Sequence, residues 1–135
     1  MALLMDTSVL VDMERRGGRL GTLTTSVPEE ELYLCAIVAA ELLSGVERAD
    51  HPARRANRLR FVEGLLGALP VLPFDLLAAR SHAVLSAEVH RRGALMGAHD
   101  LMIGATALSR GMGVLTANVG DFVRIPGLRV VRPSG

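Results

Sequence analysis

Short apolar runs alternate along this chain with longer segments of helical periodicity, and this alternation most constrains its fold. The apolar runs are ALLM before Asp6, Leu32 to Cys35, the residues around Val71, GVLT ending at Thr116, and a last short run, LRVV. Because they are continuously apolar, they predict strands of a parallel sheet that is buried on both faces. The expected fold class is therefore α/β, with three layers ordered α/β/α around a central, mainly parallel sheet of four to five strands.

Between these runs, apolar residues recur at intervals of three and four, which is the period of a helix. The segments with this pattern are Ser8 to Glu14, Ile37 to Ala49, Ala53 to Leu69, Leu76 to Arg92 and Leu101 to Arg110. Pro52 stands where a helix is expected to begin, and glycines follow the first and the last of these segments. Since no linker divides the chain, residues 1–135 are expected to form a single domain.

The charge balance argues against a molecule dominated by one sign of charge. All 15 basic residues are arginines, and they face 14 acidic residues, for a formal net charge of +1. Any surface that binds a polyanion must therefore be local. Cys35 is the only cysteine, which favours a reducing compartment. No membrane-spanning segment and no secretory signal is recognisable, so a cytoplasmic protein without membrane contact is expected.

Acidic residues stand at points where expected strands and helices meet. Asp6 follows the first strand directly, and Asp100 stands at the start of a helix. In open parallel sheets, ligands bind in the crevice at the carboxyl ends of the strands. Each aspartate taken alone is equally explained as a helix N-cap. Their function therefore depends on whether these carboxylates meet.

Glu41 lies inside an expected helix with apolar neighbours on both sides, so helix capping does not explain it. At about 100° per residue, it shares a narrow arc of that helix with Ile37, Ser44 and Arg48. Two interpretations stay open: a partly exposed glutamate that is solvated or paired with Arg48, and a functional carboxylate. A buried Glu41 would need a cation, a hydrogen-bond donor or a proton, because an unpaired buried charge is costly.

A fourth group of oxygen donors surrounds the end of the strand GVLT, where Thr116 is followed by Asn118 and Asp121. Oxygen donors without a cluster of Cys or His favour hard divalent cations such as Mg²⁺ or Mn²⁺ over structural zinc. None of the four histidines has a spacing typical of metal binding. His99, beside Asp100, stays open between a contact to substrate and a packing role.

Four blocks of the sequence resemble the PIN-domain ribonucleases and, among them, the VapC toxins of toxin–antitoxin pairs. In order, the blocks are LLMDTSVLV, AAELLSGVERA, AHDLMIGATAL and VLTANVGDFVRIPGLRVV. The resemblance implies a metal-dependent endoribonuclease that hydrolyses RNA phosphodiester bonds with Mg²⁺ or Mn²⁺. It also implies a homodimer and a small cognate antitoxin that blocks the acidic site. Apolar residues that the segments Val9 to Leu23 and Leu76 to Arg92 expose would suit such protein partners.

By this resemblance, Asp6, Glu41 and Asp100 take the family's principal acidic positions, as catalytic residues and metal ligands. The fourth position is open between Asn118, which brings no charge, and Asp121, which we include as a fourth catalytic acid and metal ligand. The side chains expected to orient ligands or water are Thr7, Ser8, Thr116 and Asn118.

Arginines are the expected contacts to RNA, with solvated helix faces as the plain alternative. The candidates are Arg48, Arg91 and Arg92, beside the arginine-rich segment from Arg54 to Arg60. Because aromatic residues are scarce, recognition should rely on phosphates and RNA shape more than on base stacking. The main alternative function is a non-catalytic PIN-like module that binds RNA or protein. An aspartyl-phosphate enzyme with Asp6 as nucleophile ranks third, because the basic residue that this chemistry needs is missing.

Overall fold

The structure is a computed structural model that describes residues 1–134. Over these residues, one sheet has the strand order β3-β2-β1-β4-β5, and every neighbouring pair is parallel. The strands are β1 (Ala2–Met5), β2 (Glu31–Cys35), β3 (Val71–Leu72), β4 (Gly113–Leu115) and β5 (Val130–Val131). The expected parallel sheet is confirmed, and the last apolar run of the sequence forms its edge strand.

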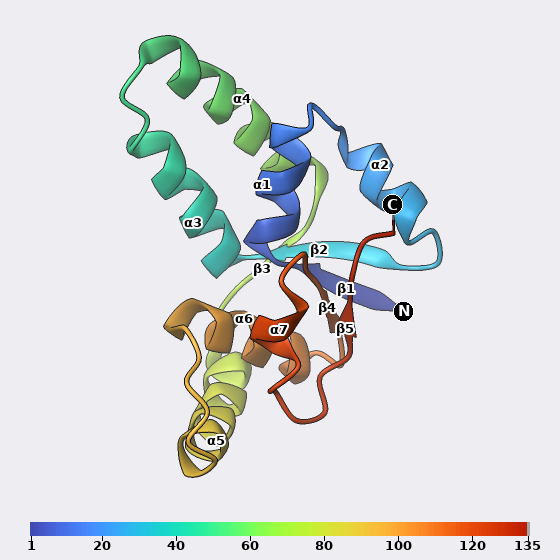
Figure 1. Ribbon diagram of the computed structural model, residues 1–135, viewed down its shortest axis with the longest axis vertical. Coiled ribbons are helices and arrows are strands. Elements are labelled where there is room, and N and C mark those ends of the chain that lie inside the picture. The colour runs from blue at the N-terminus through green and yellow to red at the C-terminus, as the bar shows by residue number, and fades with distance from the viewer. Residues whose placement is uncertain (135) are drawn as a thin grey trace.

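Helices cover both faces of this sheet (Figure 1). They are α1 (Thr7–Arg15), α2 (Leu20–Ser26), α3 (Ala36–Glu47), α4 (Pro52–Ala68), α5 (Leu76–Arg91), α6 (Ala98–Ser109) and α7 (Val119–Phe122). In Figure 1, α1 to α4 lie above the sheet and α5 to α7 lie below it. Right-handed crossovers explain this division, because the chain moves from β1 to β3 in one direction and then to β5 in the other. The three-layer α/β/α architecture is thus confirmed.

The core is centred on β1, which lies between β2 and β4. Its residues Leu3, Leu4 and Met5 are fully buried, as a strand covered by helices on both faces requires. Cys35, at the end of β2, is also buried, and burial raises the pKa of its thiol. The thiol is therefore held in its unreactive form, in agreement with a structural role.

The sequence analysis does not predict α2 and α7, which are both short. Isolated helices of this length are unstable in water, so tertiary contacts must hold them. In α7, Phe122 is fully buried. In α2, Leu23 is buried, and Ser26 Oγ lies 3.0 Å from Ser134 Oγ in the C-terminal segment. Contacts with distant parts of the chain therefore define both helices, and local periodicity does not reveal them.

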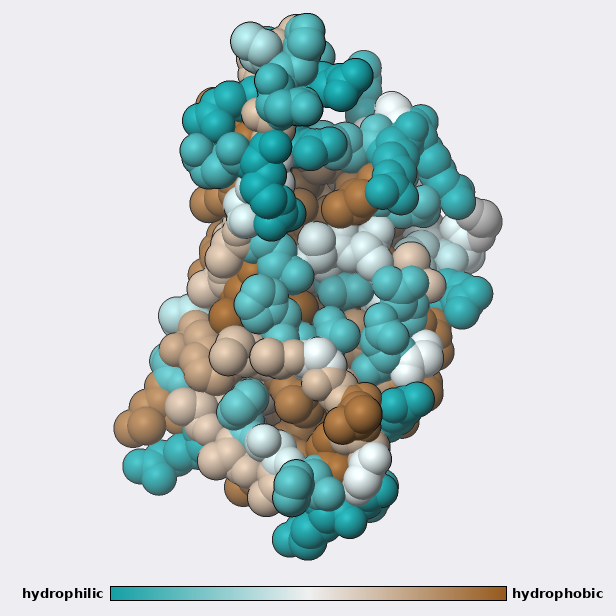
Figure 2. All heavy atoms as spheres, turned by 60° about the vertical axis from the view of Figure 1, so that its left-hand side comes forward, coloured by the Kyte–Doolittle hydropathy of each residue, from teal (hydrophilic) through white to brown (hydrophobic). Residues whose placement is uncertain are grey.

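Hydrophilic and hydrophobic side chains are unevenly distributed over the face of the molecule that Figure 2 shows. Figure 2 shows hydrophilic side chains at the upper end of the molecule, and hydrophobic ones more often in the lower half. Exposed apolar side chains of α5 include Leu76, Leu77 and Val84. Among the residues described, no helix has both the length and the apolar character that crossing a membrane requires.

The neighbouring strands β1 and β4 are followed by helices on opposite faces of the sheet. After β1 the chain enters α1 above the sheet, and after β4 it enters α7 below it (Figure 1). A crevice opens at such a point, between the carboxyl ends of the two strands. Asp6 and Thr116 are the first residues after these strands, and the Asp6 N–H donates to the Leu115 carbonyl at 2.9 Å. The fold thus brings together residues from the two ends of the sequence.

Candidate active site

Asp6 is a buried carboxylate, only 6% exposed, at the end of β1. Its Oδ2 accepts hydrogen bonds from Ser8 Oγ at 2.6 Å and from Thr116 Oγ1 at 2.9 Å. Asp6 occupies the N-cap position of α1, but within residues 1–134 its side chain makes no capping hydrogen bond. The N-cap interpretation therefore explains the position of Asp6 in sequence and leaves its carboxylate for another role.

Hydroxyl groups connect Asp6 to the loop that follows β4. Ser8 Oγ lies 3.2 Å from Thr116 Oγ1 and accepts a hydrogen bond from the Ala117 N–H at 3.1 Å. The Asn118 N–H donates to Thr116 Oγ1 at 2.9 Å. Because Thr116 is fully buried, water has little access to the bonds of its hydroxyl group. The network fixes the orientation of the Asp6 carboxylate and of the loop at the same time.

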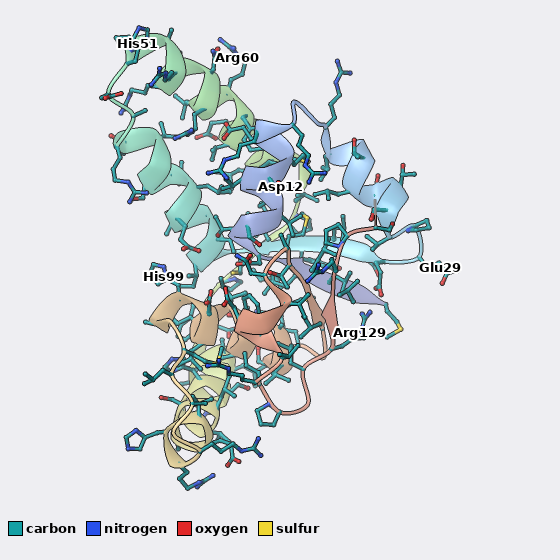
Figure 3. All side chains as sticks on the ribbon, in the orientation of Figure 1. Asp12, Glu29, His51, Arg60, His99 and Arg129 are labelled. Carbon is teal, nitrogen blue, oxygen red and sulfur yellow. The ribbon has the colours of Figure 1, made fainter. Side chains whose placement is uncertain are left out.

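Glu41 is half-buried on α3, and both of its carboxylate oxygens have partners from other elements. Thr7 Oγ1 donates to Oε1 at 2.7 Å, and His99 Nδ1 lies 3.3 Å from Oε2. Figure 3 shows His99 at the start of α6, beside the lower end of α3. Arg48 instead donates to Ser44 Oγ at 3.0 Å, so the alternative pairing of Glu41 with Arg48 is wrong. Glu41 therefore connects α3 to α1 and α6.

Asp100 lies in the first turn of α6, where Gly97 is the N-cap residue, so the N-cap interpretation of Asp100 is wrong. The pKa of Asp100 is raised from the ordinary 3.8 to about 6. Burial is the largest cause, followed by the negative charges of Asp6, Asp121 and Glu41, while His99 acts in the opposite direction. A carboxylate whose charge is disfavoured in this way is stabilised by a nearby cation.

The acidic side chains line one hollow, which we call the acidic cavity. Its volume is about 430 Å³, and it opens at the carboxyl ends of β1 and β4. Its lining includes the residues expected at the site: Asp6, Thr7, Ser8, Glu41, Asp100, Asn118 and Asp121. Thr116 lies beneath it, bonded to Asp6. Asn118 and Asp121 both line the cavity. Either of them can therefore supply a fourth oxygen donor beside Asp6, Glu41 and Asp100.

The acidic cavity also contains Asp12 and Arg15, which the sequence analysis does not assign to the site. Both lie on α1, and Asp12 pairs with Arg16 at 3.3 Å. A signal for them exists in the sequence, because Ser8, Asp12 and Arg15 are spaced by four and then three residues. That spacing places Asp12 and Arg15 on the same helix face as Ser8, which is already expected at the site.

The arginines expected to contact RNA lie in different places. Arg48 lines a hollow that adjoins the acidic cavity. Arg91 and Arg92 lie at the end of α5, where both pair with Glu88. Among the described residues, neither of these two arginines belongs to the lining of the acidic cavity. Of the three candidates, only Arg48 is therefore placed beside the acids.

The donor set of the acidic cavity suits a hard divalent cation. It offers carboxylate oxygens from several elements and the amide oxygen of Asn118, which are ligands that Mg²⁺ and Mn²⁺ prefer. The negative charges that raise the pKa of Asp100 are charges that a cation would offset. Within residues 1–134, however, no three Asp, Glu, His or Cys side chains stand close enough to hold an ion as they are now arranged. Binding a cation would require these side chains to move toward it.

Comparison with known proteins agrees with this geometry. The PIN domain family model matches residues 3–128, a span that contains every acid of the cavity. "Ribonuclease VapC1" of Rickettsia felis is 35% identical over 134 residues, which cover 99% of this chain and 98% of that protein. The chain belongs to the VapC ribonucleases of the PIN-domain family. The resemblance stated from the four sequence blocks is thereby confirmed.

Other VapC proteins are similar to this one in sequence and in fold. The "tRNA(fMet)-specific endonuclease VapC" of Salmonella typhimurium is 39% identical over 99 residues, which cover 73% of each chain. A chain in the crystal structure of DNA-bound VapBC from Salmonella typhimurium has a TM-score of 0.84 and 31% sequence identity. That match covers 98% of both chains, so it includes the sheet, both helical layers and the acidic cavity.

Proposed function

We propose that this VapC-family protein is a metal-dependent endoribonuclease toxin that hydrolyses RNA phosphodiester bonds and is inhibited by a cognate antitoxin. The observation that carries the proposal is the acidic cavity, where Asp6, Glu41, Asp100 and Asp121 come together from distant segments. Relatives named as a ribonuclease and an endonuclease support the reaction class. Clustered carboxylates repel a phosphate, so hydrolysis at this place needs a cation between them.

Mg²⁺ is the proposed cofactor, and Mn²⁺ is the proposed substitute. When bound, such a cation lowers the pKa of a water molecule and offsets the charge that develops on the phosphate. Asp6 and Asp100 would hold it, with Asp121 or Asn118 as a further oxygen ligand. The hydroxyls of Ser8 and Thr116 occupy Oδ2 of Asp6. This arrangement leaves Oδ1 of Asp6 as the oxygen that is available to the cation.

Glu41 would orient the attacking water or contribute to cation binding. Thr7 donates a hydrogen bond to one of its oxygens, and His99 Nδ1 lies 3.3 Å from the other, so residues of two other helices flank the carboxylate and restrict its orientation. Such indirect partners affect a metal site by fixing the direction of its ligands. Thr7 and His99 are therefore positioning residues in this proposal, and they take no part in the chemical step.

The proposed partners are RNA, a small antitoxin and a second copy of the chain. A solved relative from Salmonella typhimurium is a VapBC complex, which supports an antitoxin for this chain as well. A basic side chain of the antitoxin would match the negative charge of the acidic cavity. The exposed apolar residues of α5 suit the homodimer, because such patches are usually covered by a protein surface. Light scattering of the purified chain tests the dimer.

The decisive experiment is cleavage of total cellular RNA by the purified protein with Mg²⁺, with Mn²⁺ and with EDTA. Asp6→Asn keeps the shape of a buried acceptor and removes its charge. Asp50→Asn, at an exposed position between α3 and α4, is the matched control. We expect metal-dependent cleavage by the wild type and by the control, and none by Asp6→Asn. Cleavage that persists in EDTA refutes the metal requirement, and a folded wild type without any activity favours the non-catalytic binding module.

A further inference from the structure

A second hollow, of about 280 Å³, continues from the acidic cavity between α1, α3 and α4. The two hollows share the side chains of Thr7, Val11, Arg15 and Glu41, so they form one depression in the surface. We call the second one the arginine groove. Its exposed lining is formed by Arg15, Arg48 and Arg58, and its half-buried or buried lining includes Glu14, Leu42, Phe61 and Val62.

Two of the three arginines carry positive charge that no carboxylate partner offsets. Arg58 pairs with Glu14 at 3.6 Å. Among the residues that the structure describes, the one side-chain partner of Arg48 is the neutral Ser44 Oγ, to which it donates at 3.0 Å. The Arg15 side chain makes neither a hydrogen bond nor an ion pair with any of the residues that the structure describes. The groove therefore offers two guanidinium groups to an anion from outside.

Arg15 has a special position, because it lines both the arginine groove and the acidic cavity. Among the described residues, Arg15 is the one cationic side chain of the acidic cavity, and the other charged side chains that line it are carboxylates, which repel a phosphate. A guanidinium at the border lowers this repulsion and attracts the neighbouring part of a polyanion. Positive charge is thus placed where a nucleic acid strand would enter or leave the cavity.

We propose that the arginine groove binds the backbone of single-stranded RNA on one side of the scissile phosphate, with Arg15 and Arg48 as the phosphate contacts. The inference rests on the proposed ribonuclease function. A strand whose scissile phosphate lies in the acidic cavity must continue out of it, and the groove is the continuation toward α3 and α4. Guanidinium groups bind phosphate through paired N–H donors, and the apolar lining with Phe61 accepts a base face.

The test measures binding of a short fluorescent single-stranded RNA in the presence of Mg²⁺ at several salt concentrations. All proteins are full-length and carry Asp100→Asn, so that the RNA is not cut. The variants are Arg15→Gln, Arg48→Gln, and Arg60→Gln as the matched control. Arg60 is an exposed arginine on α4 that hydrogen-bonds Asn57 and points away from α3 in Figure 3.

We expect each groove variant to weaken RNA binding roughly tenfold. The slope of log affinity against log salt should fall by about 0.7 for each lost phosphate contact. The control should change neither quantity. Replacement of both groove arginines by lysine should restore most of the salt slope, because lysine keeps the charge. A role in folding alone would not produce this rescue, and thermal melts check that every variant is folded.

The outcomes separate this inference from the proposed function. The inference is overturned if the Arg15→Gln/Arg48→Gln double variant binds RNA with the affinity and salt slope of the wild type. Normal cleavage by the wild-type protein would then leave the nuclease function standing. Weakened binding in the variants, with no cleavage by the wild-type protein, supports the groove and refutes the nuclease function. If the double variant binds RNA normally but no longer binds the antitoxin, the occupant is protein and the inference is overturned.

Discussion

Thr116 Oγ1 donates a hydrogen bond of 2.9 Å to Asp6 Oδ2, between residues 110 positions apart in the sequence. The same hydroxyl accepts from the Asn118 N–H, also at 2.9 Å. One buried side chain therefore orients both the acid after β1 and the loop after β4. The direction in which Asp6 faces the cavity depends on the pairing of these two strands.

Thr116→Val is expected to destabilise the protein, because the buried Asp6 carboxylate loses a donor and the Asn118 N–H loses its acceptor. The free energy of unfolding should fall by about 1–3 kcal/mol, measured by urea denaturation. Thr25→Val is the control, since Thr25 is exposed on α2 and its hydroxyl donates to the Gly21 carbonyl of the same helix. An equal loss in both variants would contradict the special role of Thr116.

Thr7→Val is expected to reduce cleavage more than stability. Thr7 Oγ1 holds Glu41 Oε1 at 2.7 Å, so the variant frees this carboxylate to rotate. Removing such an indirect partner typically costs about 10–100-fold in metal affinity or activity. Initial rates over a range of Mg²⁺ concentrations measure both effects. Thr24→Val, which changes a hydroxyl bonded to its own helix, should cleave normally. Unaltered rates in Thr7→Val would show that Glu41 needs no such support.

The raised pKa of Asp100 predicts a stability that depends on pH in the absence of metal. Since the pKa is about 6 in the folded chain against an ordinary 3.8, folding favours the protonated form. The stabilising contribution of Asp100 is complete below pH 3.8, and it is lost as the pH rises through about 6. In EDTA, Asp100→Asn should therefore be more stable than the wild type at about pH 8, and this advantage should shrink near pH 4.

Thermal melts across this pH range check the Asp100 prediction. Added Mg²⁺ should stabilise the wild type more than Asp100→Asn, because the cation offsets the charges that disfavour ionisation. An Asp100→Asn protein less stable than the wild type at every pH would mean that the carboxylate has favourable partners in the folded chain.

The position of Asp6 could be predicted because a continuously apolar strand ends directly before it, and strand ends form the crevice of a parallel sheet. The convergence of Asp6, Glu41, Asp100 and Asp121 could not be predicted from their spacing along the chain, because spacing does not determine which helix packs against which. The family resemblance alone predicts it. The partners of Glu41 were missed for the same reason, because Thr7 and His99 belong to other elements.

Arg15 shows a further limit of the sequence. A charged residue in the last turn of an amphipathic helix is typical of a solvated face. Its spacing from Ser8 places Arg15 on the face of α1 that carries a site residue, and the packing of α1 beside α3 and α4 brings it to the border of the acidic cavity. The sequence therefore indicates which charges share a helix face, and the neighbouring helices decide what those charges contact.

The same substitution should have opposite effects at two glycines. A Cβ at Gly113 in β4 would lie 2.8 Å from the Arg129 carbonyl oxygen, so Gly113→Ala should destabilise the fold by roughly 1–3 kcal/mol. Gly64 is exposed in α4 with open space around it, so Gly64→Ala should stabilise the fold by about 0.5–1 kcal/mol. Urea denaturation of both variants measures these changes, and a stable Gly113→Ala would mean that the edge of the sheet yields easily.

The central position of β1 has a consequence for synthesis. β1 precedes the other four strands of the sheet in the sequence, yet Leu3 pairs with Gly113 in β4. A nascent chain thus carries Asp6 long before its partner Thr116 has been translated. Until residues as far as Asp121 have emerged, no growing polypeptide has a complete acidic cavity. The order of synthesis therefore delays the assembly of the acidic cavity until nearly all of its elements have been made.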